Sequence, residues 1–361
     1  MKVFRRTFEL PFNVNIPNKI DIHLKNRNLY SRFLKFIRRY IFLTIKGQRK
    51  KEIFSIENSH QSILWINISA PSIGDSLMDL SSRVLLKGRA TDLFTDKKNS
   101  HIYLSDQIFQ NVFTDISQIK IDSYDLIILD SYSTRSVRVK SKIAPNLNFV
   151  GMFGYFNGPE VHRILYSFNR MNQLLGYPFN DKKISKIAKN YISISHSDQE
   201  LVQSITPDDF ISIVLGGDWS YRNYRNWDKV IERLVSDNPE LIIAFIGSNN
   251  AIDISEQLVT KFSNYNIINF VNKLTFNQTV ELIKRGKITL CCDGGLLHGS
   301  EAVGAKVLAL FARLKPEILL TKNNFCYTIY NESNVNNILP NKVIREYYKA
   351  IKSDRKVKEK N

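Results

Sequence analysis

The segment Ser72-Ile73-Gly74-Asp75 is the first part of the chain whose residue types are suited to chemistry. It follows the apolar run 63–68, which predicts a strand, and small residues after a strand let a backbone approach a ligand. A carboxylate at the carboxyl end of such a strand is placed to take the proton of an attacking hydroxyl group. Asp75 is therefore a candidate general base. The alternative is that its side chain only caps the following helix.

A second candidate segment combines glycines with arginines. Gly216 and Gly217 end the apolar run 211–215, and Arg222 and Arg225 follow shortly before a predicted helix. Glycines admit close backbone approach, and a guanidinium pairs bidentately with phosphate oxygens, so the segment indicates a phosphate site. Its spacing matches neither a P-loop nor a GxGxxG turn. A solvated arginine turn is an equally good interpretation.

The third segment, Asp293-Gly294-Gly295-Leu296, is the most specific of the three. It lies between the apolar run 287–292 and a predicted helix that contains His298. Backbone N–H groups at a helix start can hold a diphosphate, and the helix dipole with a nearby arginine can stabilise a leaving nucleoside diphosphate without a metal. His298 is a candidate ligand contact. A core-facing histidine that bonds to a loop is the slightly favoured alternative.

The three segments lie within a pattern of short apolar runs that alternate with amphipathic stretches. This pattern predicts a doubly wound α/β fold, whose strands and helices would position the segments. Open parallel sheets bind ligands beyond the carboxyl ends of their strands, so we expect two Rossmann-like domains facing a central cleft. In the first half we predict strands at 63–68, 91–95, 124–130 and 148–152 and a helix at 161–175. After the polar segment 193–209 we predict strands at 211–215, 241–247, 266–270, 287–292 and 306–311, with helices at 227–236, 255–262, 276–284 and 296–303.

The basic charge is concentrated at the two ends of the chain. The net charge of the 361 residues is +17, of which residues 1–60 carry +10 and residues 342–361 carry +5. Such ends are suited to an anionic partner. Because the middle is nearly neutral and holds no recognisable nucleic-acid-binding module, we do not expect nucleic acid to be that partner.

Residues 29–46 have the pattern of a basic amphipathic helix that ends at Gly47. Two interpretations are equally favoured: the helix packs on the core of the protein, or it lies on an anionic membrane surface. No apolar stretch approaches the roughly 18 residues that span a bilayer, and the chain start lacks the apolar core of a signal peptide. The chain has three cysteines, and the adjacent Cys291 and Cys292 lie in an apolar run that predicts a buried strand rather than a disulfide. This fits a reducing compartment, so we expect a cytoplasmic protein that is either soluble or peripheral.

The order and spacing of these motifs resemble glycosyltransferase family 9, the lipopolysaccharide heptosyltransferases. The resemblance covers roughly residues 61–335 and is carried by Ser72-Ile73-Gly74-Asp75, by Arg225 before Trp227, and by Asp293-Gly294-Gly295-Leu296-Leu297-His298. His162-Arg163, before Leu174-Leu175-Gly176, is also similar to the interdomain region of the family. The chain departs from the family at Gly294, where a hydroxyl residue is usual, at Ala312-Arg313-Leu314-Lys315 in place of Gly-Pro-Thr-Asp, and at Leu77-Met78-Asp79-Leu80 after the candidate base.

The resemblance implies the GT-B architecture and transfer of a sugar from a nucleotide donor, with no metal and no other cofactor. In this scheme Asp75 is the base, with Ser72, Gly74 and Arg163 on the acceptor side. The donor would be bound by Gly216, Gly217, Arg222, Arg225, Asp293, Gly294, Gly295, Leu296 and His298. The donor implied by the family is ADP-heptose, and the acceptor is an anionic lipid-linked core oligosaccharide at the cytoplasmic face of the inner membrane, which the basic N-terminal helix and C-terminal tail would contact.

Three alternatives remain for the function, and the sequence also suggests domain limits. The alternatives are a transferase that uses another nucleotide sugar for capsule, O-antigen or protein glycosylation, an inert member of the family, and, remotely, a nucleic-acid-binding protein. The expected segments are a basic extension at 1–60, an acceptor domain at 61–195, a donor domain at 196–335, and a C-terminal helix and tail at 336–361.

Overall fold

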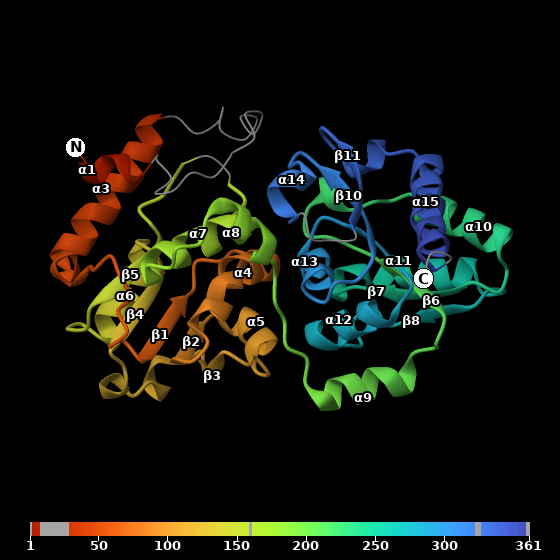
Figure 1. Cartoon of the computed structure of the whole chain (residues 1–361). Helices are drawn as coiled ribbons and strands as arrows, with labels where there is room; N and C mark the ends of the chain where they lie inside the picture. The colour runs from red at the N-terminus through yellow and green to blue at the C-terminus, as the bar shows by residue number, and fades with distance from the viewer. Residues whose placement is uncertain (1, 8–28, 159–160, 322–325, 359–361) are drawn as a thin grey trace. The chain divides into compact units, whose positions relative to one another are not determined.

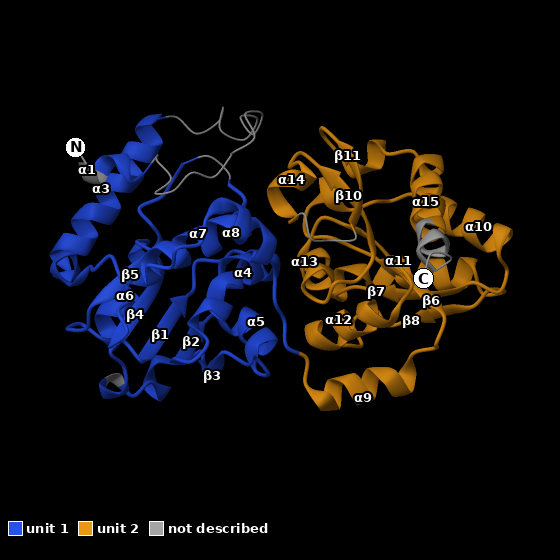
Figure 2. Cartoon of the chain, in the orientation of Figure 1, with its two compact units in different colours: residues 1–193 blue, residues 194–361 orange. Residues whose placement is uncertain are grey.

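A computed structural model of the chain describes residues 2–7, 29–158, 161–321 and 326–358. The chain forms two compact units, residues 1–193 and residues 194–361, which are coloured separately in Figure 2. Figure 1 labels most of the helices and strands of both units. Each unit contains one sheet in which all pairings between neighbouring strands are parallel.

Unit 1 is a doubly wound domain with the strand order β3-β2-β1-β4-β5. Ile63, Leu64 and Trp65 of β1 are fully buried, so the strand is apolar on both of its faces. This is expected of a central strand in a parallel sheet, which is covered on both sides. The strands are β1 (Ser62–Asn67), β2 (Ala90–Thr95), β3 (Phe109–Phe113), β4 (Leu126–Ser131) and β5 (Phe149–Gly154). The helices are α1 (Lys2–Arg5), α3 (Leu29–Ile45), α4 (Ile73–Asp79), α5 (Lys97–Ser100), α6 (Thr134–Ile143), α7 (Arg163–Leu175) and α8 (Asp181–Ile187).

Unit 2 has the strand order β11-β10-β9-β6-β7-β8, which is the strand order of a dinucleotide-binding Rossmann sheet. The strand order reverses between β6 and β9, and ligands bind such sheets beside this reversal. The strands are β6 (Phe210–Val214), β7 (Ile242–Ile246), β8 (Ile267–Asn269), β9 (Thr289–Cys292), β10 (Val307–Ala312) and β11 (Cys326–Asn331). The helices are α9 (His196–Ile205), α10 (Trp227–Asp237), α11 (Ile252–Lys261), α12 (Phe276–Arg285), α13 (Gly295–Ala302), α14 (Pro316–Leu319) and α15 (Pro340–Lys358).

The prediction of two Rossmann-like halves is confirmed, and each predicted strand and helix of the two halves is present with its ends shifted by a few residues. Several elements were not predicted, among them β3, β11 and helices α5, α6, α8 and α9. Strands β3 and β11 lie at sheet edges, and each has a single buried residue, Phe109 in β3 and Ile329 in β11. Helix α9 lies within the segment 193–209, which was expected to be a polar loop. The helix was missed because Val202 is its one buried side chain, so its sequence has little apolar periodicity.

The amphipathic helix α3 packs on unit 1 through one face. Phe36 and Leu43 join the apolar cluster around β1 and β4, and Arg39 donates from Nη1 to the carbonyl oxygen of Tyr155 at 3.1 Å. The packing interpretation is therefore correct for this face of the helix. In the described part of the chain, no helix has the length and apolar character needed to cross a bilayer. Residues 8–28 of the predicted extension and 359–361 of the predicted tail lie outside the described residues.

Candidate active site

Asp75 occupies the first turn of α4 at the carboxyl end of β1, and it is not the residue that caps the helix. Ser72 is the N-cap: its backbone is extended, and its Oγ accepts from the Asp75 amide at 3.2 Å and donates to Asp75 Oδ2 at 2.7 Å. The interpretation of Asp75 as a simple N-cap is thus wrong. Gly74 is buried in the same turn. The Asp75 side chain remains 23% exposed, so a substrate can reach its carboxylate.

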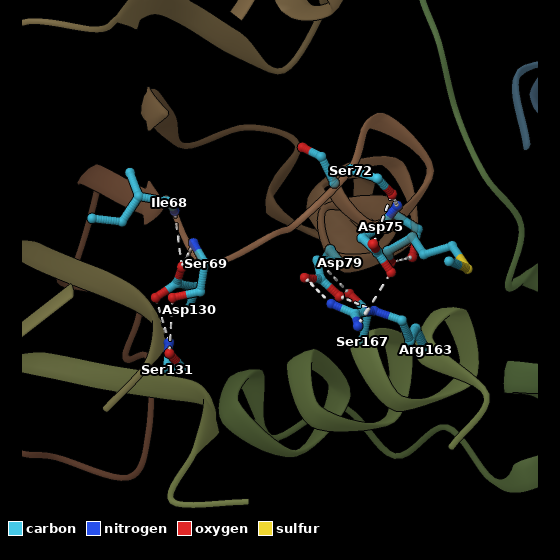
Figure 3. A network of polar contacts seen from close by, with 12 residues as sticks. Ile68, Ser69, Ser72, Asp75, Asp79, Asp130, Ser131, Arg163 and Ser167 are labelled. Carbon is cyan, nitrogen blue, oxygen red and sulfur yellow. Dashed lines mark hydrogen bonds and ion pairs between the residues drawn. The ribbon is translucent and has the colours of Figure 1, made fainter. Parts of the chain in front are cut away.

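An arginine from α7 joins Asp75 to a second carboxylate, as Figure 3 shows. Arg163 binds Asp79 through two bonds, Nε to Oδ1 at 2.8 Å and Nη2 to Oδ2 at 2.6 Å. Its Nη1 lies 3.3 Å from Asp75 Oδ1. Bidentate pairing with Asp79 fixes the plane of the guanidinium and with it the position of Nη1. Asp79 therefore holds Arg163 in place against the candidate base.

Asp79 was not predicted as a site residue, although it lies one helical turn after Asp75. Its side chain is buried, and burial raises the pKa of Asp79 to about 6, while the Arg163 guanidinium opposes this rise. Ser167 of α7 also donates to the Asp79 carbonyl oxygen at 2.7 Å, which ties α4 to α7 at the same point. Near neutral pH the carboxylate is ionised and pairs with Arg163. The i,i+4 spacing of Asp75 and Asp79 was the available signal in the sequence.

Asp130, at the end of β4, anchors the loop that leads to Asp75. Its Oδ2 accepts from the amides of Ile68 at 2.8 Å and Ser69 at 2.7 Å, as Figure 3 shows. Burial raises the pKa of Asp130, and the hydrogen bonds from Ser136 and from these amides lower it. A buried carboxylate that accepts several N–H bonds rigidifies the segment it joins. Asp130 thus fixes the start of the loop between β1 and α4.

In unit 2 the glycine turn after β6 requires glycine. Gly216 has a φ of 79° and Gly217 a φ of 158°, which side chains rarely adopt. A Cβ at Gly216 would also lie 2.6 Å from Asn250 Oδ1. The turn lies beside Asp293, which follows the neighbouring strand β9. Both segments predicted to bind the donor therefore flank the point where the strand order reverses.

The structure separates the two predicted arginines. Arg222 Nη1 lies 2.8 Å from Asp293 Oδ2, and the Asp293 side chain is 2% exposed. The Arg225 side chain is exposed, and its backbone amide donates to Asn336 Oδ1 at 2.7 Å. Arg222 is thus the arginine that lies at the glycine turn with Asp293.

The start of α13 has the form expected of an anion site. Gly294 is the N-cap with an extended backbone and no side-chain cap, and Gly295 and Leu296 begin the helix. The first amides of a helix have no partner within it, and glycines leave them accessible to a ligand. His298 is buried, with Nε2 4.0 Å from Asp293 Oδ1 and Nδ1 3.7 Å from Glu301 Oε2. This position favours an internal role for His298 rather than a direct contact.

Each of the two groups of residues is suited to its own chemistry. The partly exposed Asp75 carboxylate in unit 1 can accept a proton, and the glycine turn, the Arg222 guanidinium and the start of α13 in unit 2 can bind phosphate. Within the described ranges no three His, Cys, Asp or Glu side chains are grouped as metal ligands.

Residues 158–338 match the sequence profile of glycosyltransferase family 9 (heptosyltransferase). Among solved structures, the chain is similar to a family 9 glycosyl transferase from Veillonella parvula, with a TM-score of 0.69 and 13% identity, covering 83% of this chain and 100% of that one. It is also similar to ADP-heptose lipopolysaccharide heptosyltransferase II from E. coli, with a TM-score of 0.62, 13% identity and coverage of 81% and 99%. The E. coli heptosyltransferase WaaC, solved with ADP, gives a TM-score of 0.58, 12% identity and coverage of 80% and 98%. None of the curated proteins matches the chain.

Proposed function

Because the chain belongs to glycosyltransferase family 9 and is a glycosyltransferase of the heptosyltransferase fold, we propose that it transfers heptose from an ADP-linked donor to a lipid-linked core oligosaccharide. One observation carries the donor part of this proposal: Arg222, Asp293 and the start of α13 lie together at the carboxyl ends of β6 and β9. Positive charge and free helix amides at this place fit a diphosphate.

In the proposed reaction Asp75 removes the proton from the attacking acceptor hydroxyl. The hydroxyl oxygen forms the new glycosidic bond while the bond from the sugar to the nucleoside diphosphate breaks. The leaving diphosphate gains negative charge, which the α13 dipole and Arg222 stabilise. We propose that these groups act without a metal ion. Arg163 positions Asp75, and Asp79 holds Arg163.

Thermal unfolding in the presence of nucleotides tests the donor assignment. We expect ADP to raise the Tm, because a ligand at 100 times its Kd stabilises the native state by about 2.7 kcal/mol. UDP, GDP and CDP are the matched comparisons, and EDTA in every sample tests the metal-independent scheme at the same time. Stabilisation by UDP or GDP but not ADP would contradict the heptose assignment and favour another nucleotide sugar for capsule, O-antigen or protein glycosylation. Stabilisation by none of the four would contradict the nucleotide-sugar scheme.

The proposed lipid-linked acceptor calls for contact with an anionic membrane, and α3 has a face suited to it. Opposite its packed side, α3 exposes Tyr30 by 65%, Leu34 by 48%, Ile41 by 49% and Ile45 by 74%. The helix and the following turn, residues 29–51, contain eight Lys or Arg residues and no Asp or Glu. Exposed apolar side chains flanked by basic ones are typical of helices that lie at a lipid surface. We therefore propose that α3 both packs on unit 1 and contacts the inner membrane.

Vesicle binding tests this second partner. Leu34→Asp with Ile41→Asp is expected to lower binding to vesicles containing phosphatidylglycerol by about tenfold or more, because two apolar contacts become negative charges. Leu104, which is 71% exposed in the same unit, provides the control variant Leu104→Asp. Sedimentation with vesicles measures the effect. Equal binding of wild type and double variant, or equal binding to uncharged phosphatidylcholine vesicles, would contradict the membrane contact.

A further inference from the structure

Arg313 has a backbone conformation that arginine rarely adopts. It follows the carboxyl end of β10, and its φ is 68°. A positive φ brings the Cβ of an L-residue close to its own backbone, and glycine or asparagine normally occupies such a position. Asn272 is the other non-glycine residue with positive φ in the described ranges. Strained residues of this kind concentrate at functional sites, where the surrounding structure holds them.

The side chain of Arg313 lies at the glycine turn of unit 2. Its Cζ is 3.8 Å from the centre of the Tyr221 ring, and its Nε donates to the Ser333 carbonyl oxygen at 3.3 Å. The Arg222 guanidinium is 5.3 Å from the centre of the same ring, and its Nε donates to Tyr221 Oη at 3.2 Å. Strand β10 pairs with β9, so Arg313 and Asp293 follow the ends of neighbouring strands.

Two guanidinium groups on one tyrosine ring repel each other unless negative charge balances them. Asp293 pairs with Arg222, whereas none of the ion pairs found among the described residues involves Arg313. Because Asp293 balances only one of the two guanidinium groups, the pair carries a net positive charge. Arg222 connects this pair to Asp293, which precedes the N-cap of α13, and the N-terminus of a helix itself favours anions. The aromatic ring fixes the direction of both guanidinium groups through cation–π contacts.

We propose that Arg313 binds the diphosphate of the donor together with Arg222, and that it sets the preference for a diphosphate over a monophosphate. This inference rests on the proposed function. A glycine at position 313 would adopt the positive φ without strain but would supply no charge. The strained arginine therefore gains its contact with the ligand at the expense of backbone stability.

Replacing Arg313 by glycine separates a binding role from a structural one, because the two roles predict opposite signs. If Arg313 binds diphosphate, Arg313→Gly raises the Kd for ADP and for inorganic pyrophosphate by about tenfold or more, and that for AMP by less than about threefold. The Tm of the free variant stays equal or rises, since the strain is relieved. Arg313→Lys, which keeps the charge but not the planar fork, is expected to bind ADP with intermediate affinity.

Isothermal titration of the full chain with ADP, AMP and pyrophosphate measures these affinities, with Arg233→Ala as a control of equal charge on the exposed side of α10. If another nucleoside diphosphate stabilises wild type in place of ADP, it and its monophosphate are used. Unchanged diphosphate affinity in Arg313→Gly would overturn the inference and leave the proposed function intact. A fall in Tm together with an equal loss of AMP and ADP binding would have the same meaning, because it would show a structural role. If wild type bound pyrophosphate through Arg313 but no nucleoside diphosphate, the diphosphate site would stand and the proposed function would fall. Binding of neither would overturn both.

Discussion

Asp75→Asn is expected to lower the rate of glycosyl transfer by about 10²–10⁴-fold, the range that a positioned general base contributes. The amide has nearly the same shape as the carboxylate but cannot accept a proton at neutral pH. It can still accept the hydrogen bond from Ser72 Oγ, so the first turn of α4 keeps its cap. Donor affinity should be unchanged because the donor residues belong to unit 2. Steady-state kinetics with saturating donor and acceptor measures the loss in kcat.

Asp181→Asn provides a matched control for the loss of a first-turn carboxylate. Asp181 lies in the first turn of α8, which has seven residues like α4, and its side chain is exposed. Both substitutions remove one favourable interaction with a helix dipole, which is worth about 0.3–1 kcal/mol. Only Asp75→Asn should affect transfer. Full activity in a folded Asp75→Asn protein would show that Asp75 is not the base.

The pattern of apolar runs was sufficient to predict both sheets, because a central parallel strand must be apolar on both faces. Ile63–Ile66 and Leu290–Cys292 are buried on this account, and their runs are visible in the sequence. Edge strands β3 and β11 have one side without a neighbouring strand, so their sequences need not be continuously apolar. An edge position alone does not hide a strand, since β5 and β8 also lie at sheet edges and were predicted from the apolar runs 148–152 and 266–270.

Three of the site residues could be predicted because they lie in segments that come after a predicted strand. These are Asp75 after β1, Gly216 after β6 and Asp293 after β9. Asp79 and Asp130 did not stand out, because their importance depends on contacts between elements distant in sequence: Arg163 on α7 for Asp79, and the amides of Ile68 and Ser69 for Asp130. Spacing along one chain segment gives no information on such partners.

The choice between Arg222 and Arg225 illustrates the same limit. Both lie a few residues after the glycine turn, and a position along the chain does not show which guanidinium turns toward it. The short 3-10 helix Ser220–Arg222 brings Arg222 to Asp293, whereas the Arg225 backbone is bonded to Asn336 and its side chain is exposed. Arg222 and Arg225 are therefore a matched pair for mutation, because the same residue type lies in two different surroundings.

Arg222→Gln is expected to raise the Kd for the donor nucleoside diphosphate by about 10–100-fold, because a charged hydrogen bond contributes about 1.5–3 kcal/mol. Arg225→Gln should change it by less than about threefold. Arg222→Gln also leaves the buried Asp293 carboxylate without this partner, so we expect a lower Tm. The double variant Arg222→Gln with Asp293→Asn removes the unpaired carboxylate and so separates the effect on stability from the effect on binding. If the double variant regains its Tm but not its affinity, Arg222 contacts the phosphate directly. Titration calorimetry at fixed ionic strength provides the comparison. A larger loss for Arg225→Gln than for Arg222→Gln would reverse the assignment, and it would require the loop between the glycine turn and α10 to rearrange when the donor binds.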